Sequence, residues 1–391
     1  MQRPHAATGS PRLIHLTTTD ISLALLLLPQ LEAFRAAGYE VIGVSAPGPY
    51  VDTLQAHGIR HVPLHRSTRE MDPVGDVASM VEFLRLCREL RPDIVHTHNP
   101  KPGLYGRVAA RLAGVPVVVN TVHGLYALPT DPWPKRAVVY GLERIAAACS
   151  HAELLQNPED LPVLRRLRIP DERLHVLGNG IDLTRFDPSD RAGLRSEVRS
   201  ELGYGDDDVI IGAVGRLVEG KGYRELFAAM RHVRRRHPQA QLLVVGPRDD
   251  AKPDAIPETI MDGLGDGDGI RFLGLRHDVE RLYAAMDLYV LASHREGFPR
   301  SAMEAAALQL PIVATDIRGC RQVVDHGHNG LLVPPRAPTA LAHALSELVA
   351  DPTRRASMAE ASRAKALASF DDRTQVRITL DIYERLLADS P

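Results

Sequence analysis

Short runs of aliphatic and β-branched residues alternate along this chain with longer segments whose apolar positions recur every three or four residues. In the first half, such runs predict strands at Arg12–Leu16, Glu40–Ser45, Asp93–His96, Val115–Asn120 and Ala152–Gln156. In the second half, they predict strands at Val209–Val214, Gln241–Val245, Ile270–Leu273, Leu288–Leu291 and Ile312–Thr315. The intervening segments show helical periodicity, as in residues 77–90. This alternation is typical of βαβ units and parallel sheets.

Gly, Asn and Pro interrupt the alternation between residues 176 and 188, before a charged stretch at 191–201. We therefore predict an α/β protein with two doubly wound, Rossmann-like domains, which span residues 1–182 and 183–369. Residues 370–391 form a predicted helix that crosses back to the first domain. Open parallel sheets bind ligands outside the carboxyl ends of their strands. Two such domains that face each other therefore predict a central cleft for the ligand.

The 391 residues carry 47 Lys and Arg against 49 Asp and Glu, a formal charge of −2. Proteins that wrap nucleic acid are usually far more basic, so we expect no nucleic-acid partner. The three cysteines show no paired spacing, which argues against a disulfide framework and a zinc cluster. The longest aliphatic stretch, residues 21–28, is too short to span a membrane. These features predict a cytoplasmic protein.

A glycine-rich loop with two cations follows the predicted strand at 209–214. It begins at Gly215 and places Arg216 and Lys221 beside a helix that starts at Tyr223. The amides and dipole of a helix N-terminus favour anions, and glycines let a ligand approach the backbone, so this loop suits a diphosphate. Its spacing matches neither the Walker loop nor GxGxxG. An ordinary glycine-rich turn with two exposed cations is the alternative interpretation.

Two carboxylates follow the predicted strand at 288–291. Pro299 is typical of the first turn of a helix, so Glu296 belongs to the loop before that helix and Glu304 to its second turn. One carboxylate can then hold a ribose and the other a hexose, with the amides of Gly297 and Phe298 nearby. In the alternative interpretation, Glu304 is a solvated helix residue.

Three histidines lie near the ends of predicted strands in the first half. His123 follows one strand, where its side chain can reach a ligand, although a structural histidine is the alternative. His96 and His98 occupy alternate positions just before Asn99 and Lys101. No carboxylate or cysteine completes a ligand set around them, so we predict no metal site.

Together these motifs resemble the retaining family 4 glycosyltransferases with the GT-B fold, also called group 1 glycosyl transferases, over nearly the whole chain. In the second half, the resemblance is carried by residues 215–222, Phe272–Gly274, Asp287–Ser293, the Glu-x7-Glu motif from Glu296 to Glu304, and Pro311–Thr315. In the first half, it is carried by Asp93–His98, Gly114–Val119 and Val-His-Gly at 122–124, and between the halves by Asn179–Asp182.

The resemblance implies catalytic roles for His123, Glu296, Arg216 and Lys221. It implies donor-binding roles for Gly215, Arg216 and Lys221 at the diphosphate, Glu304 at the ribose, Phe272 and Leu273 near the base, and Glu296, Gly297, Phe298 and Pro299 at the sugar. His123 would contact the sugar from the acceptor side. Because cations and amides would stabilise the leaving diphosphate, neither a metal nor another cofactor is expected.

Two segments depart from the family pattern. The family commonly has Gly-Gly in its first strand–helix loop, where this chain has Thr-Thr-Thr-Asp-Ile-Ser at 17–22. The family's usual glycine before Pro311 is Leu310 here, which we interpret as a packing change. The predicted acceptor-side residues, which include two polar substitutes from the first loop, are Asp20, Ser22, His98, Asn99 and Lys101.

The resemblance implies retaining transfer of a hexose from a UDP- or GDP-sugar to a hydroxyl. Lipid-linked saccharides are frequent acceptors in bacterial relatives, so we expect such a saccharide of an envelope or capsular glycan. Two alternatives stay open. A non-hydrolysing UDP-sugar 2-epimerase shares the two-domain architecture and needs no acceptor. A catalytically silent protein would bind the nucleotide sugar without transferring it.

Residues 131–147 combine the only tryptophan, Trp133, with cations and an apolar stripe. This composition suits a helix that lies on an anionic membrane surface, which would place the protein peripherally on the inner face of the cell membrane. An ordinary amphipathic core helix with a basic edge is the alternative.

Overall fold

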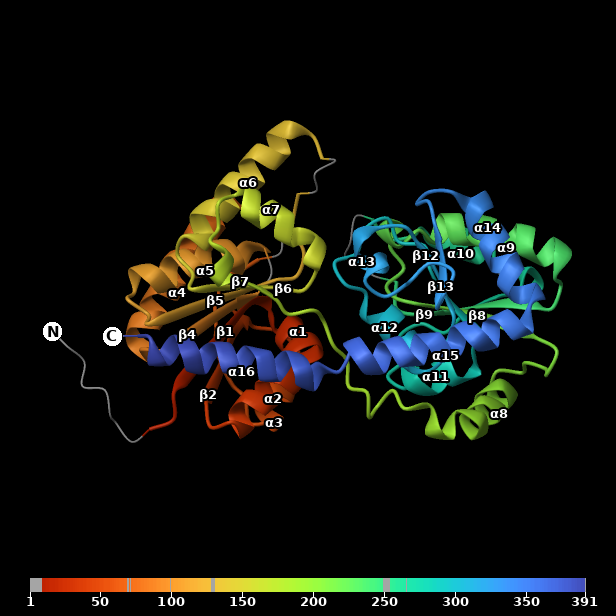
Figure 1. Ribbon diagram of the computed structural model, residues 1–391, viewed down its shortest axis with the longest axis horizontal. Coiled ribbons are helices and arrows are strands. Elements are labelled where there is room, and N and C mark those ends of the chain that lie inside the picture. Colours follow the sequence, from red (N-terminus) through yellow and green to blue (C-terminus); the bar gives the residue numbers. More distant parts are fainter. Residues whose placement is uncertain are drawn as a thin grey trace. The chain divides into compact units, whose positions relative to one another are not determined.

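The structure is a computed structural model that describes residues 9–68, 70, 72–98, 100–127, 131–248, 254–264 and 266–390. It divides the chain into two compact units, Met1–Gly178 with Arg373–Pro391, and Asn179–Asp372 (Figure 1). The sequence pattern predicts boundaries after residues 182 and 369. The structure's boundaries differ by a few residues because Ile181 and Asp371 form a short parallel bridge, and the amide of Ile181 donates to the carbonyl of Phe370 at 2.9 Å.

The first unit contains a seven-stranded parallel sheet in the order β3-β2-β1-β4-β5-β6-β7. Its strands are β1 (Arg12–Thr19), β2 (Glu40–Ala46), β3 (Arg60–Pro63), β4 (Ile94–His98), β5 (Val117–Val122), β6 (Ala152–Leu155) and β7 (Leu174–Val176). Its helices are α1 (Asp20–Ser22), α2 (Leu28–Ala36), α3 (Val51–Ala56), α4 (Pro73–Leu90), α5 (Pro100–Leu112), α6 (Trp133–Ala147), α7 (Leu161–Arg166) and α16 (Asp372–Ala388). A π-helical turn, Leu23–Leu27, joins α1 to α2.

Helices cover both faces of this sheet. Successive side chains of a strand point to opposite faces. On β1, Leu13 belongs to a buried cluster with Phe34 of α2 and Tyr383 of α16, whereas Ile14 belongs to another with Phe83 of α4. Figure 1 shows α16, the last helix of the chain, packed along the first unit on the side of α2. Burial on both faces explains why apolar residues of the central strands point to both sides of the sheet, instead of alternating with solvent-exposed polar ones.

The second unit contains a six-stranded parallel sheet in the order β10-β9-β8-β11-β12-β13. Its strands are β8 (Val209–Val214), β9 (Ala240–Val245), β10 (Ile270–Phe272), β11 (Leu288–Leu291), β12 (Ile312–Thr315) and β13 (Gly330–Val333). Its helices are α8 (Arg191–Glu201), α9 (Tyr223–Arg236), α10 (Glu258–Asp262), α11 (Val279–Ala285), α12 (Arg300–Ala307), α13 (Arg318–Arg321), α14 (Pro338–Ala350) and α15 (Pro352–Ser369). Buried clusters join α9 and α14 to one face of the sheet, and α8, α11 and α12 to the other. The predicted pair of doubly wound α/β units is confirmed.

All ten predicted strands are present, and three further strands, β3, β7 and β13, were not predicted. Each has three or four residues and lies at a sheet edge. β3 and β7 are only partly buried and lack an apolar run, whereas β13 is mostly buried but only four residues long, so each leaves little signal in the sequence. The helix expected at 77–90 begins earlier, at Pro73, because Asp72 caps it by accepting the amide of Gly75 at 3.0 Å.

In each sheet, the strand order reverses beside the first strand of the unit. The neighbours at this point are β1 and β4 in the first unit, and β8 and β11 in the second. The chain leaves such neighbouring strands in opposite directions, which opens a crevice at their carboxyl ends where doubly wound proteins bind ligands. Lys221 and Glu296 follow β8 and β11, whereas His98 ends β4 and His123 follows the neighbouring strand β5.

Candidate active site

The loops after β8 and β11 contact each other at the reversal point of the second sheet. The amide of His294 donates to the carbonyl of Gly220 at 2.9 Å. Gly222 has a left-handed φ of 70°, and a Cβ on it would lie 2.0 Å from the carbonyl oxygen of Ala292. Only glycine fits there. Gly222 therefore serves the contact between the two loops.

Lys221 and Glu296, which lie 75 residues apart in sequence, meet at this contact. The Lys221 Nζ donates to Glu296 Oε1 at 2.6 Å, and the Ser293 hydroxyl donates to the same oxygen at 2.6 Å. The side chains of Lys221 and Glu296 are 25% and 13% exposed, so both remain reachable from solvent. Glu296 Oε2 accepts no hydrogen bond from the described residues. The geometry thus brings together a cation and a carboxylate that still has a vacant acceptor atom.

Gly215 and Arg216 begin the loop after β8. The amide of Gly215 donates to a carbonyl of β9 at 2.8 Å, and its own carbonyl accepts the hydroxyl of Tyr223 at 2.9 Å. The start of the loop is therefore fixed to the sheet and to the first residue of α9. The Arg216 side chain is exposed.

Glu304 lies on α12, five residues into the helix. It is half-buried, and the Tyr283 hydroxyl donates to its Oε2 at 3.1 Å. Burial raises the pKa of the Glu304 carboxyl. This environment differs from that of a solvated helix residue. Pro299 precedes the helix as its N-cap with extended backbone, so it does not occupy the first turn as predicted.

Two aromatic residues predicted near the donor pack into the core. The ring of Phe272 meets Phe227 edge-on at 5.8 Å, and that of Phe298 meets Phe370 edge-on at 6.0 Å. The amide of Leu273 donates to a carbonyl of β9 at 2.9 Å. Both rings are half-buried and stabilise the unit through these contacts, and their predicted donor contacts stay predictions.

The polar substitutes in the first strand–helix loop have structural partners. Asp20 is buried, and its two carboxylate oxygens accept the amides of Ile21 at 2.8 Å and Tyr50 at 2.7 Å. Asp20 thus ties α1 to the loop after β2, which explains a carboxylate where the family has glycine. Ser22 is half-buried at the end of α1, and its predicted acceptor contact stays a prediction.

Lys101, in the first turn of α5, holds a neighbouring loop. Its Nζ donates to the carbonyls of Thr68 at 2.9 Å and Glu70 at 2.6 Å, and it lies 2.6 Å from the Asp76 carboxylate. Its charge is therefore already compensated within the unit. Asn99, the other polar residue predicted here, lies outside the described residues.

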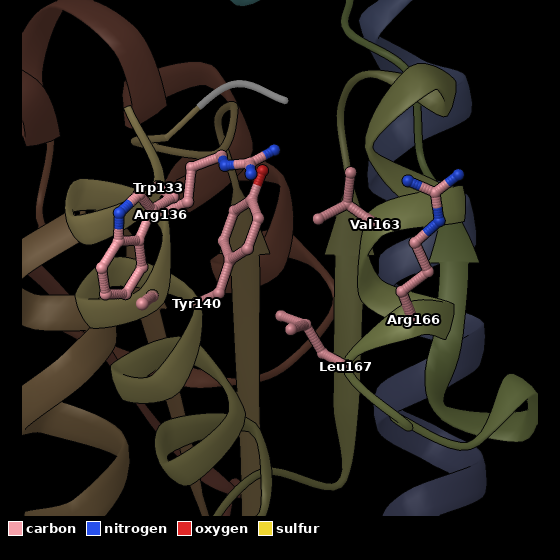
Figure 2. Close-up of a pocket in the computed structure, with 7 residues that line it drawn as sticks. Trp133, Arg136, Tyr140, Val163, Arg166 and Leu167 are labelled. Carbon is pink, nitrogen blue, oxygen red and sulfur yellow. The ribbon is translucent and has the colours of Figure 1, made fainter. Parts of the chain in front are cut away.

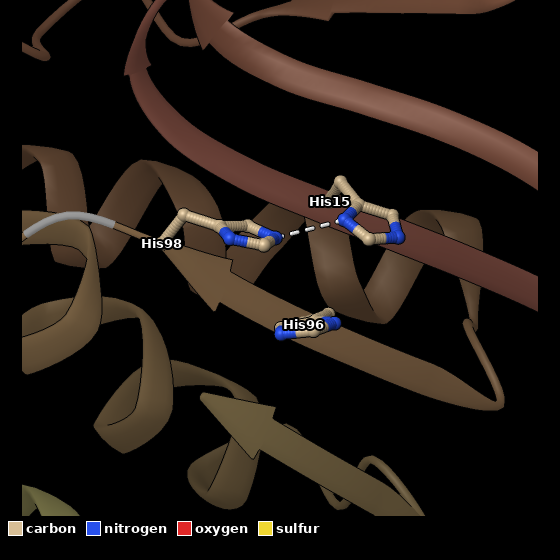
Figure 3. A group of neighbouring side chains, drawn as sticks. All are labelled: His15, His96 and His98. Carbon is tan, nitrogen blue, oxygen red and sulfur yellow. Dashed lines mark hydrogen bonds between the residues drawn. The ribbon is translucent and has the colours of Figure 1, made fainter. Parts of the chain in front are cut away.

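His98 and His123 belong to a cluster of four histidines at the reversal point of the first sheet, in which His123 is half-buried and the other three are buried. His15 on β1 and His96 on β4 are register partners, and His98 follows two residues later on the same face (Figure 3). The His15 and His98 rings hydrogen-bond at 2.9 Å, and those of His98 and His123 at 3.2 Å. The sequence did not indicate that His15 joins this group, because it lies 83 residues from His98.

The histidines of this cluster are neutral at pH 7. Burial lowers the pKa of His15 to about 3 and that of His123 to about 4. Burial and the neighbouring rings hold the pKa values of His96 and His98 well below the usual value of 6.5.

Neutral imidazoles are common metal ligands, and the ring nitrogens of His15, His96 and His98 offer a set within 4.8 Å of one another. Five of their six nitrogens already have hydrogen-bond partners, since His96 pairs with Thr121 at 2.7 Å and with the Tyr383 hydroxyl. The arrangement therefore fits a hydrogen-bonded cluster. That the protein needs no metal stays a prediction.

A buried ion-pair network supports the strand that leads to His123. Arg107 of α5 donates to Glu153 on β6 at 2.7 Å and to Glu143 on α6 at 2.9 Å. The Asn120 amide on β5 donates to the second oxygen of Glu153 at 2.7 Å. Arg107 and Glu153 are almost completely buried. The only signal in the sequence is a charged residue within an apolar strand or helix face, which by itself indicates no partner.

Comparison with known proteins identifies the family. Residues 30–185 match the family profile Glycosyltransferase Family 4, and residues 195–365 match Glycosyl transferases group 1. Over 290 residues, which cover 73% of each chain, the protein is 29% identical to UDP-Gal:alpha-D-GlcNAc-diphosphoundecaprenol alpha-1,3-galactosyltransferase of Escherichia coli. It is 32% identical to the D-inositol 3-phosphate glycosyltransferase of Xylanimonas cellulosilytica over 95% of this chain and 93% of that protein.

Among solved structures, the chain matches that of Anabaena Alr3699/HepE in complex with UDP. The TM-score is 0.80 at 22% identity, and the match covers 96% of this chain and 100% of that one. This likeness extends through both Rossmann-like units. The chain therefore belongs to the group 1, or family 4, glycosyltransferases, and its two parallel-sheet units are those of the GT-B fold.

Proposed function

We propose that this glycosyltransferase moves a hexose, with retention of configuration, from a UDP-sugar to a hydroxyl of a lipid-linked saccharide. The observation that carries the proposal is the meeting of Lys221 with Glu296 at the carboxyl ends of β8 and β11. The E. coli relative is named for a UDP-galactose donor and a diphosphoundecaprenol acceptor, and HepE is described with UDP. These names support a uridine nucleotide and a lipid-linked acceptor.

The donor chemistry follows from the charges of the second unit. Lys221, with Arg216, supplies positive charge beside the N-terminus of α9, where a leaving diphosphate gains stabilisation as its charge develops. Glu296 offers its Oε2 to a sugar hydroxyl, and the half-buried Glu304 offers a carboxylate to the ribose. In a front-face reaction, the leaving phosphate oxygen takes the proton of the acceptor hydroxyl, so no enzymatic nucleophile is required.

The test begins with a panel of nucleotide sugars, in which binding is scored by thermal shift and donor hydrolysis by product analysis. Lys221→Ala should lower transfer from the selected donor by about 10²–10³-fold, because loss of one group that stabilises developing charge costs that much. The matched control is Lys365→Ala, which removes another paired lysine of the same unit, 2.7 Å from Asp325. Near-normal transfer by Lys221→Ala would contradict the diphosphate assignment.

Product analysis separates this function from its alternatives. An epimerase would convert the donor sugar without any acceptor, whereas a transferase consumes the donor productively only when an acceptor hydroxyl is present. A silent binding protein would show nucleotide-sugar affinity by calorimetry and no product in either case. Retention is read from the anomeric configuration of the purified product by NMR.

The acceptor side of the proposal rests on α6. Several of its apolar side chains face solvent, with Trp133 72%, Val138 62% and Ile145 61% exposed, and the buried residues of this helix are Ala146 and Ala147. This exposure is the opposite of what an ordinary core helix shows. Lys135, Arg136 and Arg144 on the same helix add positive charge, which favours an anionic surface. Within the described chain, no helix combines the length and apolar character needed to cross a membrane.

A cavity of about 390 Å³ lies between α6 and α7, and Trp133 is among the residues that line it. Figure 2 shows Arg136 and Tyr140 of α6 on one side and Val163 and Leu167 on the other. The mixture of apolar, aromatic and guanidinium groups suits an anionic amphiphile such as a lipid with a phosphate headgroup. We therefore include an anionic membrane surface among the proposed partners.

Flotation with vesicles tests the membrane contact. The protein should float at low salt with vesicles that contain phosphatidylglycerol, and not with vesicles of phosphatidylcholine alone. Replacing Trp133 and Ile145 by Ser should lower the bound fraction at least tenfold, since each buried apolar side chain contributes about 1.5–3 kcal/mol. Val74→Ser, which changes an 81% exposed valine on α4, is the matched control. Failure of the wild type to float at low salt would contradict this part of the proposal.

A further inference from the structure

Three histidines and a glutamine form one continuous hydrogen-bonded chain in the first unit. His15 Nδ1 lies 2.9 Å from His98 Nε2, which Figure 3 shows as a dashed contact between β1 and β4. His98 Nδ1 lies 3.2 Å from His123 Nε2, and His123 Nδ1 lies 3.1 Å from Gln156 Oε1. His15 and His98 are fully buried, whereas His123 is half-buried, so only the last ring of the chain is open to a ligand.

The tautomers of the three rings depend on one another, because each hydrogen bond between them needs a single proton. A neutral imidazole carries one N–H donor and one acceptor nitrogen, and each contact in the chain needs one proton. Once one ring adopts a tautomer, each of its neighbours must adopt the same one. Only two arrangements satisfy all contacts, with the proton on Nδ1 of every ring or on Nε2 of every ring. The lowered pKa values of His15, His98 and His123 keep the rings neutral, as this coupling requires.

The two ends of the chain choose between these arrangements. At one end, Gln156 presents an oxygen to His123, and this oxygen accepts a proton from Nδ1. At the other end, His15 Nε2 is buried without a hydrogen-bond partner among the described residues. With protons on Nε2, this atom would be a buried N–H without an acceptor, which is among the rarest defects in folded proteins. With protons on Nδ1, it is an unused acceptor, which is tolerated more readily.

We propose that His98, supported by His15, is a positioning residue that fixes His123 as the Nδ1–H tautomer with Nε2 as an acceptor. This inference rests on the proposed function insofar as His123 contacts the sugar. Both His123 nitrogens are then engaged, Nδ1 as the donor to Gln156 and Nε2 as the acceptor from His98 at 3.2 Å, the longest contact of the chain. In this state the ring has no free N–H, so it does not donate to a phosphate.

Nitrogen NMR of the full-length chain, labelled with ¹⁵N-histidine, tests the tautomers directly. Protonated and unprotonated ring nitrogens resonate in separate regions, and single His→Gln variants assign the signals. We expect His15, His98 and His123 each to show a protonated Nδ1 and an unprotonated Nε2 in the wild type. A protonated Nε2 on His123, or averaged signals from two tautomers, would overturn the proposal. The wild-type spectrum decides this even where a variant fails to fold.

Variants test which residues fix the tautomer. His98→Phe cuts the chain, so His123 should show a mixture of tautomers, and kcat/KM should fall by about tenfold because the ring loses its orientation. Tyr383→Phe is the control, because its hydroxyl pairs with His96 in the same cluster but outside the chain. It should leave the His123 tautomer unchanged. A single unchanged His123 tautomer in His98→Phe would overturn the positioning role.

A different measurement tests the proposed contact between His123 and the sugar. His123→Gln removes the ring that is proposed to contact the sugar. If transfer by this variant is normal while the wild-type spectrum shows the expected tautomers, the sugar contact of His123 is wrong and the hydrogen-bonded chain stands.

Discussion

The buried histidines should make the first unit sensitive to mild acid. His15, His96 and His98 are at most 2% exposed, and burial lowers their pKa values, for His15 to about 3. In the unfolded chain, the same rings have a pKa of about 6.5. At a pH between the folded-state and the unfolded-state pKa of a ring, the unfolded chain therefore binds more protons than the folded one. The free energy of unfolding is fully retained above about pH 7 and falls as the pH drops below about 6.5.

The size of this effect follows from the proton difference. At pH 5, an imidazole that is neutral when folded and free to protonate when unfolded costs about 2 kcal/mol of stability relative to alkaline pH. The three fully buried rings together amount to about 6 kcal/mol, which is comparable with the 5–15 kcal/mol that typically stabilises a domain. Near pH 5.5, each ring lowers the free energy of unfolding by about 1.2 kcal/mol for each unit by which the pH falls.

Urea unfolding between pH 7.5 and pH 5, followed by pulsed hydrogen exchange and mass spectrometry, measures the loss in each unit separately. Peptides from β4 report on the first unit, and peptides from β8 serve as the internal comparison. His15→Asn keeps an N–H donor near the position of Nδ1 but cannot titrate, so it should reduce the slope by about 1.2 kcal/mol per pH unit. An unchanged slope in His15→Asn, or equal stability of the β4 peptides at pH 5 and pH 7.5, would refute the reasoning.

Two further predictions concern packing around the site. Gly222→Ala should destabilise the second unit by about 1–3 kcal/mol and reduce transfer, because its Cβ would lie 2.0 Å from the Ala292 carbonyl at a left-handed φ. Gly220→Ala, whose Cβ would have no neighbour closer than 4.0 Å, is its control, and equal melting temperatures for the two variants would contradict the prediction. Arg107→Leu should cost about 3–5 kcal/mol in urea unfolding, because it leaves the Glu153 carboxylate buried without its cation. Replacing both Arg107 and Glu153 by Leu should recover much of this loss, and a double variant no more stable than Arg107→Leu would argue against an uncompensated charge as the cause.

Periodicity predicts most of this fold because the parallel sheets are buried on both faces. Apolar runs mark all ten of the predicted strands. The strands β3 and β7 were not predicted because they are only partly buried, and β13 because its apolar run is only four residues long. The boundaries between the units depend on the bridge between Ile181 and Asp371, which joins segments 190 residues apart and leaves no local pattern.

The site is predictable in part for the same reason. The rule for parallel sheets places the loops after neighbouring strands together, so the encounter of Lys221 with Glu296 follows once β8 and β11 are known to be neighbours. The partners of Asp20 and Lys101 follow from no such rule, because Tyr50 and Thr68 approach them through the particular path of two loops. Residue type alone could not distinguish these structural charges from ligand-binding ones.

The two reversal points differ in chemistry, and this difference bears on what each unit can bind. In the second unit, Lys221 and Glu296 form an ion pair that is partly exposed and can exchange its partners for those of a charged ligand. In the first unit, the carboxylate of Asp20 and the ammonium of Lys101 are already compensated, and the histidines are neutral. A diphosphate would find positive charge only at the former. The neutral histidines of the latter offer an anion no positive charge, and charging them for it would carry the cost of burying a charge.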